Sequence, residues 1–321
     1  MRLEGKKSKG KRFNEIGVLG ALVLLCAVIS IANPAFYSAS NLINLARQTS
    51  YVVIIAIFMT MVIIVGGMDL SVGSVIGVSG IAVAMFLKMG LPIPVAVVAS
   101  MVVASLVGLF NGTLIVLVRM PAFIVTLGTM YIARGICNGL TKGVPVYPLP
   151  EQFSVIGNGT VFGVPGSVFF VIIVAFVLDF ILKNTTFGRS VYAIGGNEET
   201  ARLSGINVTR IKIMIYLLSS LAAAAAGVIM TSRIESGQTS LGQGWEMTVI
   251  ASAIIGGTSM LGGSGTVLGT VLGAALMSVI SNGMIIMNVS VYWQNIAIGA
   301  IIVLSVAIDL ISKRRAGLDV K

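Results

Sequence analysis

The sequence predicts an all-α polytopic membrane protein with about ten transmembrane helices and one short cytoplasmic helix between the sixth and the seventh. Of the 321 residues, 56% are hydrophobic and only 10% are charged, whereas a soluble domain carries roughly 25% charged residues. The apolar residues form runs close to the ~20 residues that cross a bilayer, and Gly, Pro and polar residues separate the runs.

The chain begins with a basic stretch, residues 1–15, followed by an apolar run from Ile16 to Ala32. A secretory signal has the same basic start, but Asn33-Pro34 follows in place of a small-residue cleavage site, which favours a retained first span. The further spans are predicted at residues 51–65, 75–88, 95–118, 122–140, 166–182, 213–231, 246–255, 266–287 and 291–310. The eighth is so short that it tilts little or is partly re-entrant.

The basic residues give the orientation of these spans. With the N-terminus inside, most of the 21 Lys and Arg residues fall on the inner side, and Arg47, Lys88, Arg134, Lys142 and Arg233 fall outside. This asymmetry follows the positive-inside rule. We therefore expect a transmembrane domain over residues 16–312, with residues 1–15 and 313–321 both in the cytoplasm.

The longest polar passage, residues 188–208, lies in an inner loop over residues 183–212. Asn197 is suited to cap a helix, Glu198 and Glu199 fit its first turn, and Gly205 is suited to end it in the left-handed conformation. The pattern predicts a helix of about two turns, from Glu198 to Ser204. Because so short a helix has no core of its own, it needs a docking partner, and the orientation makes that partner cytoplasmic.

Composition excludes several classes of chemistry. The chain has no histidine, and its two cysteines, Cys26 and Cys137, lie in apolar runs, so a zinc site, a Ser-His hydrolase and a structural disulfide are all disfavoured. No Gly-x-x-x-x-Gly-Lys-Ser/Thr loop is present, so any ATP is bound by another chain. We expect no cofactor, metal or catalytic residue here, and membrane orientation explains the net charge of +10 better than nucleic-acid binding does.

Three outer loops are predicted, at residues 33–50, 141–165 and 232–245. The second is the main external loop, rich in Gly and Pro, and it is the best candidate to receive an external partner. Ordinary surface loops have the same composition, so the sequence leaves both readings open.

Two glycine-rich breaks have the same spacing: Gly66-Gly67 with Gly73-Ser74, and Gly256-Gly257 with Gly263-Ser264. The first contains a structural helix break with Gly67, Asp69, Ser71 and Gly73. Asp69 is expected to cap the third span by accepting backbone N–H groups that the break frees. The alternative is a carboxylate that binds substrate or a coupling ion, since acids within the membrane are commonly functional.

At these residues the chain resembles the ABC importer permeases for monosaccharides, of the ribose, galactose and xylose type. The most specific matches are residues 67–74, residues 188–208 and Ile255-Gly256-Gly257-Thr258-Ser259 with Gly262-Gly263. Glu199, Thr200 and Ala201 before Gly205 also resemble the importer pattern Glu-Ala-Ala-x-x-x-Gly, with Thr200 in place of the first Ala and without the later Pro. The resemblance covers nearly the whole chain.

The resemblance implies a transport subunit of the bacterial inner membrane that is not itself an enzyme. Two permease chains, most simply a homodimer, would form the pore with membrane lipid around them, a cytoplasmic ATPase would supply ATP and Mg²⁺, and an external binding protein would deliver the sugar. Ribose is the first expectation, although the sequence does not name the sugar. The implied ATPase-coupling residues are Gly195, Gly196, Asn197, Glu198, Glu199, Ala201, Arg202, Leu203, Ser204 and Gly205.

A route for a neutral sugar needs hydrogen-bonding side chains beside apolar or aromatic surface. Candidates within or near the spans are Asn111, Phe123, Thr126, Asn282 and Asn295. The polar ones serve equally well to bond a neighbouring helix, so both roles stay open. An ion-coupled secondary transporter is the alternative function, and it would need a deeply placed Asp69.

Overall fold

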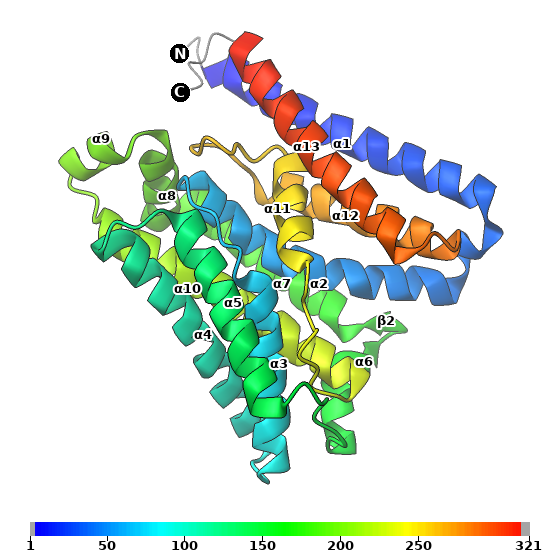
Figure 1. The fold of residues 1–321 in the computed structure, drawn as a ribbon. Coiled ribbons are helices and arrows are strands. Elements are labelled where there is room, and N and C mark those ends of the chain that lie inside the picture. The colour runs from blue at the N-terminus through cyan, green and yellow to red at the C-terminus, as the bar shows by residue number, and fades with distance from the viewer. Residues whose placement is uncertain (1–3, 316–321) are drawn as a thin grey trace. The chain divides into compact units, whose positions relative to one another are not determined.

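The computed structural model describes residues 4–315 of the chain. Ten apolar helices dominate this part (Figure 1). They are α1 (Glu4–Ala32), α2 (Ala39–Ile64), α3 (Val72–Lys88), α4 (Ile93–Leu117), α5 (Ala122–Thr141), α7 (Gly166–Asn184), α10 (Val208–Ile234), α11 (Trp245–Ile255), α12 (Val267–Ile286) and α13 (Val291–Arg315).

The remaining elements are short. They are the helices η1 (Pro34–Tyr37), η2 (Glu151–Ser154), α6 (Val155–Asn158), α8 (Thr186–Gly196) and α9 (Glu198–Leu203), and the strands β1 (Thr160–Val161) and β2 (Val164–Pro165). The two strands form an antiparallel pair in which Val161 faces Val164.

Seven helices are long and apolar enough to cross a membrane, among residues 4–315: α1 from Glu15 onward, α2, α4, α5, α7, α10 and α12. Shorter apolar helices are α3, α11 and the part of α13 up to Ala307. Each predicted apolar run falls on one of these helices, so the all-helical membrane architecture is confirmed. The number of crossings stays a prediction.

The first predicted outer loop, residues 33–50, is largely wrong. After the 3-10 helix η1, α2 already begins at Ala39, because Ser38 caps it by accepting a hydrogen bond from the Asn41 N–H at 3.4 Å. The connection between α1 and α2 is therefore short. Likewise α1 begins at Glu4, so the expected border at residue 15 is not an end of secondary structure, and residues 1–3 and 316–321 of the predicted termini lie outside the described part.

The main loop, residues 141–165, carries η2, α6 and the β1–β2 pair. Its residues bond the end of α10: Ser232 Oγ donates to the Phe153 carbonyl at 2.5 Å and accepts from the Gly157 N–H at 2.8 Å. Val146 also forms an isolated antiparallel bridge with Gly237. The second and third predicted outer loops thus contact one another, as loops on one side of a membrane can.

The chain divides into two compact units. The first comprises Met1–Gly66, Ala175–Gly196 and Met247–Lys321, and the second comprises Gly67–Val174 and Asn197–Glu246. The division passes between α8 and α9, at the junction of Gly196 and Asn197.

In the first unit α12 packs against both α1 and α2. A cluster of Ile29, Phe36 and Val279 joins α1, η1 and α12. The most hydrophobic part of α2 is 78% buried and that of α1 only 6%, so α2 is the central helix of the two, and α1 has the exposed apolar surface expected against lipid.

In the second unit α10 packs against α3 and α4, and α3 also packs against α5. Val83, Leu87, Ala96, Phe153 and Val228 form an apolar cluster from α3, α4, η2 and α10. Small residues let these helices approach closely: an added Cβ at Gly108 of α4 would overlap the Tyr216 carbonyl of α10. Such contacts replace the hydrophobic driving force that is weak between helices in lipid.

Candidate functional site

The predicted cytoplasmic helix is present as α9, Glu198–Leu203, with Ser204 as its C-cap. Asn197 is extended, and its side-chain oxygen accepts from the Thr200 N–H at 2.8 Å. At the other end Gly205 is left-handed, with φ of +81°. The Gly205 N–H donates to the Arg202 carbonyl and the Ile206 N–H to the Ala201 carbonyl, which is a Schellman ending.

Glu198 ties α9 to α10. Its carboxylate accepts from Arg202 at 3.1 Å within α9 and from Lys212 of α10 at 2.5 Å. The hydrogen bond from Lys212 is the largest cause that lowers the pKa of Glu198, and the positive charges of Lys212 and Arg202 act in the same direction. The helix is thereby fixed to the start of a long span.

The opposite side of α9 is open. Ala201 is buried, whereas Glu199 and Arg202 are exposed and Leu203 is 84% exposed. A leucine with this exposure on a polar, six-residue helix leaves an apolar side chain free for contact with another chain. The arrangement suits docking better than it suits a simple connector.

The passage before α9 is also helical, which the sequence did not predict. α8 covers Thr186–Gly196 and buries Gly188, Val191 and Ile194 on one face. These residues follow one another at intervals of three, a helical spacing that could have revealed the element.

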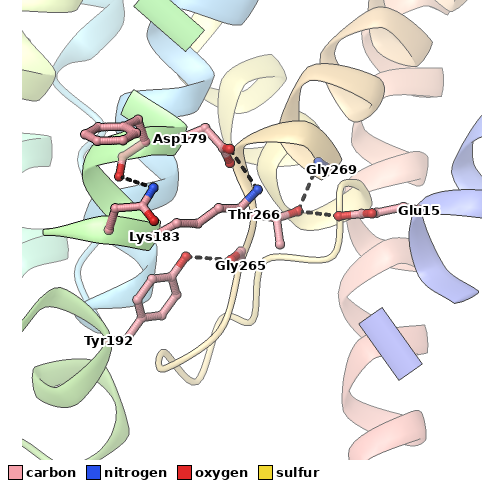
Figure 2. A network of polar contacts seen from close by, with 9 residues as sticks. Glu15, Asp179, Lys183, Tyr192, Gly265, Thr266 and Gly269 are labelled. Carbon is pink, nitrogen blue, oxygen red and sulfur yellow. Dashed lines mark hydrogen bonds and ion pairs between the residues drawn. The ribbon is translucent and has the colours of Figure 1, made fainter. Parts of the chain in front are cut away.

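Polar contacts fix α8 and the glycine-rich loop, residues 256–266, within the first unit (Figure 2). Tyr192 Oη donates to the Gly265 carbonyl at 2.9 Å. Burial raises the pKa of Tyr192, and the nearby Asp179 raises it further, so the phenol remains a donor at neutral pH. Thr266 Oγ1 accepts from the Gly269 N–H at 3.0 Å and donates to Glu15 Oε1 at 2.8 Å.

Glycines bring three backbone segments together at the same place. The Gly263 N–H donates to the Ile64 carbonyl at the end of α2, at 2.8 Å. A Cβ added to Gly195 of α8 would overlap both of these backbone atoms, whereas one added to Gly196 would meet no atom within 4 Å. Gly195 therefore lacks a side chain for a steric reason.

The first helix break is built differently and lies in the second unit. The fully buried Asp69 accepts from the Ser71 N–H at 3.0 Å and from Ser71 Oγ at 2.6 Å, while Ser219 Oγ of α10 donates to its other oxygen at 3.1 Å. The N-cap of α3 is Ser71, which makes no side-chain cap bond. Asp69 therefore accepts one backbone N–H at the break, as expected, but the N-cap residue of α3 is Ser71, and the other carboxylate oxygen of Asp69 bonds α10.

Two of the pathway candidates join this cluster. Asn111 Nδ2 of α4 donates to Ser71 Oγ at 2.9 Å. Thr126 Oγ1 of α5 lies 3.2 Å from the Met68 carbonyl, and its shorter hydrogen bond, at 2.9 Å, goes to the Ala122 carbonyl of its own helix. Both side chains are fully buried. With Asp69 they form a polar cluster around residues 67–71, the stretch that includes Gly67.

The other candidates lie apart from this cluster. Asn282 of α12 exchanges hydrogen bonds with Asn41 of α2, at 2.9 and 3.1 Å, inside the first unit. Phe123 is 52% exposed and Asn295 is exposed. Gly73 of the predicted break accepts a hydrogen bond at its carbonyl from Arg134, at 3.1 Å.

Several residues that build these sites were missed from the sequence. They are Lys212, Tyr192, Ser219, Glu15 and Arg134, whose partners are 14 to 251 residues away along the chain. Only Lys212, beside the predicted inner loop, had a signal in the sequence, namely its charge opposite to Glu198.

Comparison with known families decides what kind of protein carries these features. The family described as "Branched-chain amino acid transport system / permease component" matches residues 41–306. The chain is a permease of this family. The permease is therefore a multi-pass membrane protein and a transport subunit without catalytic residues of its own, and the family implies ATPase and binding-protein partners.

Curated relatives cover nearly the whole permease. It is 40% identical to the ribose import permease protein RbsC of Haemophilus influenzae over 90% of this chain and 91% of that protein. It is 37% identical to the ribose import permease protein RbsC of Bacillus subtilis, over 96% and 98%, respectively. The xylose transport system permease protein XylH of Escherichia coli is 34% identical, over 93% of each chain. No solved structure matches the permease significantly.

Proposed function

We propose that this permease forms the membrane pore of an ATP-binding cassette importer that carries a monosaccharide, a ribose-like pentose first, into the cytoplasm. The observation that carries the proposal is α9: a capped helix without a core, fixed to α10 through Glu198 and Lys212, with Leu203 exposed. The similarity to ribose and xylose permeases supports the sugar class.

The full proposal has ten crossings, with both termini in the cytoplasm of a bacterial inner membrane. A cytoplasmic ATPase holds ATP and Mg²⁺ and docks on residues 195–205, an external sugar-binding protein meets the outer loops, and a second permease chain completes the pore. Residues 141–165 bond the end of α10, which supports placing the loops at residues 141–165 and 232–245 on the same side of the membrane.

An ion-coupled carrier is disfavoured by the surroundings of Asp69. Both carboxylate oxygens already accept hydrogen bonds from Ser71 and Ser219. A cation would have to displace these bonds, so Asp69 is better suited to hold the helix break than to bind a coupling ion.

The test of docking is a pull-down of the intact chain, solubilised in mild detergent, with its ATPase. Leu203→Arg removes the exposed apolar contact and should reduce ATPase recovery at least tenfold, as should Glu199→Arg. Glu151→Lys, on the outer loop, is the matched control and should recover the ATPase as the wild type does. An ATPase that binds Leu203→Arg and wild type equally would refute docking on α9.

The test of transport is uptake of radiolabelled ribose and xylose by cells that express the permease with its ATPase and binding protein. We expect uptake that stops when ATP hydrolysis is blocked in the ATPase and that survives collapse of the ion gradient. Uptake that follows the ion gradient instead would overturn the importer proposal in favour of the ion-coupled carrier.

A further inference from the structure

The connection from α10 to α11 and the first two residues of α11, together called the turn segment (residues 235–246), run beside α3 in the second unit. In Figure 1 it is the irregular yellow trace that leads from α10 to α11. Near its start, a Cβ at Gly237 would meet Ala84 and Gly80; near its end, a Cβ at Gly242 would overlap the Gly73 carbonyl. The segment thus follows α3 from its C-terminal part back to its first turn.

With α3 crossing the membrane as proposed, this path takes irregular backbone deep into the bilayer. α3 ends at the exposed Lys88, and Gly73 precedes Lys88 by roughly 22 Å of helix, compared with a hydrocarbon core of ~30 Å. Backbone that is not helical occurs at such depth only inside protein or along a water-filled cavity. The shortness of α11 has the same cause, because the turn segment has already covered part of the crossing.

Arg134 of α5 fixes the turn segment in place. Its Nη1 donates to the carbonyls of Thr239 and Leu241, and its Nη2 donates to the Gly73 carbonyl of α3. One guanidinium thus joins α5, the turn segment and α3. Because its acceptors in the turn segment are backbone carbonyls, these bonds do not use the side chains of that segment.

Several polar side chains of the turn segment are left available. Ser240 and Gln243 are exposed, and Gln238 and Trp245 are half-buried. Among residues 4–315 the side-chain amides of Gln238 and Gln243 form no hydrogen bond, and the Gln238 and Ser240 N–H groups find no backbone acceptor. Lipid cannot satisfy such groups, so they must face water or a polar solute.

We propose that the turn segment lines the solute route, where Gln238 and Gln243 hydrogen-bond the sugar hydroxyls and Trp245 offers them an apolar face. The inference rests on the proposed function and extends it to particular residues. Uncharged amides and a hydroxyl match a neutral, polyhydroxylated solute, whereas the core of an interface with a second copy would be more apolar.

The first test is labelling of single cysteines in the assembled importer in intact cells, after Cys26→Ser and Cys137→Ala. A charged, membrane-impermeant methanethiosulfonate reagent is added outside to Gln243→Cys or Ser240→Cys. We expect labelling at least tenfold faster than in Leu106→Cys, an exposed apolar position on α4, and at least threefold slower in saturating ribose or xylose. Equal rates in Gln243→Cys and Leu106→Cys would overturn the inference.

Oxidative cross-linking of Gln243→Cys separates a solute route from an interface. If this variant forms disulfide-linked dimers and resists the reagent, a second copy covers the turn segment and the inference fails. If the reagent labels it without dimers, the inference stands. Labelling does not require uptake, so a permease that labels rapidly but imports neither sugar refutes only the proposed sugar.

The second test separates sugar contact from structure. Gln243→Ala and Trp245→Ala should raise the KM for uptake about tenfold at unchanged membrane levels and ATPase recovery, and Trp245→Phe should restore most of the loss. An unchanged KM in Gln243→Ala and Trp245→Ala, with normal protein levels, would contradict a role of these side chains in binding the sugar.

Discussion

The two glycine-rich connections are residues 65–71 between α2 and α3 and residues 256–266 between α11 and α12. They begin with the same glycine pair, and Gly73 in the first turn of α3 corresponds to Gly263 in the spacing, but they differ in what holds them. The first is held by side chains around the buried Asp69, from α4 and α10. The second is held mainly by backbone contacts, with Gly263 bonded to the Ile64 carbonyl and Gly195 packed against both. Similar sequence spacing therefore does not imply the same stabilising chemistry.

The difference has a physical origin. A buried carboxylate needs several donors, since leaving it unbonded is costly, so the first connection recruits Ser71 and Ser219. A connection in which backbone segments pack through glycines needs no side-chain partners, but an added Cβ atom would overlap the neighbouring backbone. The first should therefore be sensitive to loss of polar atoms and the second to gain of apolar ones.

The largest expected effect comes from Gly195→Ala. Its Cβ would overlap the Ile64 carbonyl and the Gly263 N–H, so α8 must shift, at a cost of about 3 kcal/mol. Thermal unfolding of the purified permease would measure the loss. Gly196→Ala is the control, because its Cβ meets nothing within 4 Å, and a similar loss in both variants would contradict the steric explanation.

Asp69→Ala should have the next largest effect. It leaves the hydroxyls of Ser71 and Ser219 without their acceptor, which costs about 2 kcal/mol. Asp69→Asn keeps an acceptor and should lose less, while Asp179→Ala, which removes only a partly exposed pair with Lys183, should change the same unfolding temperature little. If Asp69→Asn lowered the unfolding temperature as much as Asp69→Ala, the negative charge of Asp69 and not its hydrogen bonds would stabilise the helix break.

Tyr192→Phe measures how much one side-chain hydrogen bond stabilises the glycine-rich connection at residues 256–266. Loss of the hydrogen bond to the Gly265 carbonyl should cost about 1 kcal/mol, less than Gly195→Ala. Tyr131→Phe, at a residue that is 69% exposed, provides the baseline in the same measurement. A larger effect of Tyr192→Phe than of Gly195→Ala would reverse the comparison.

The smallest effect concerns Glu198, a carboxylate that is half exposed in contrast to the buried Asp69. Because Lys212 lowers the pKa of Glu198, its contribution is fully present above the ordinary value of 4.5 and is lost as the pH falls through the lowered pKa. Solvent screening limits it to about 0.5 kcal/mol. Glu198→Gln should lower the unfolding temperature slightly at pH 7 and by less as the pH falls below 4.5, whereas a difference that does not change with pH would exclude the ion pair as its cause.

Local patterns predicted α9 well and the helix breaks only in part. The Asn197 cap and the Gly205 ending depend on neighbours within a few residues, so the sequence contains them directly. The start of α2 was missed because Asn41 and Arg47 resemble loop residues, whereas Asn41 in fact bonds Asn282, 241 residues away. The partner of Asp69 on α10, Ser219, is 150 residues away, and no single-sequence pattern reports such a contact.

The ion pair between Glu198 and Lys212 couples α9 to α10, so a rotation of α9 is transmitted to the long helix α10. With 27 residues α10 is about 40 Å long, so a pivot of about 10° at the α9 end moves its other end by about 7 Å. The turn segment continues from that end, at Ile234, and Arg134 holds it to α3 and α5, so these helices have to move with it. A small rotation applied to one six-residue helix would in this way become a displacement of several ångströms at the far end of α10.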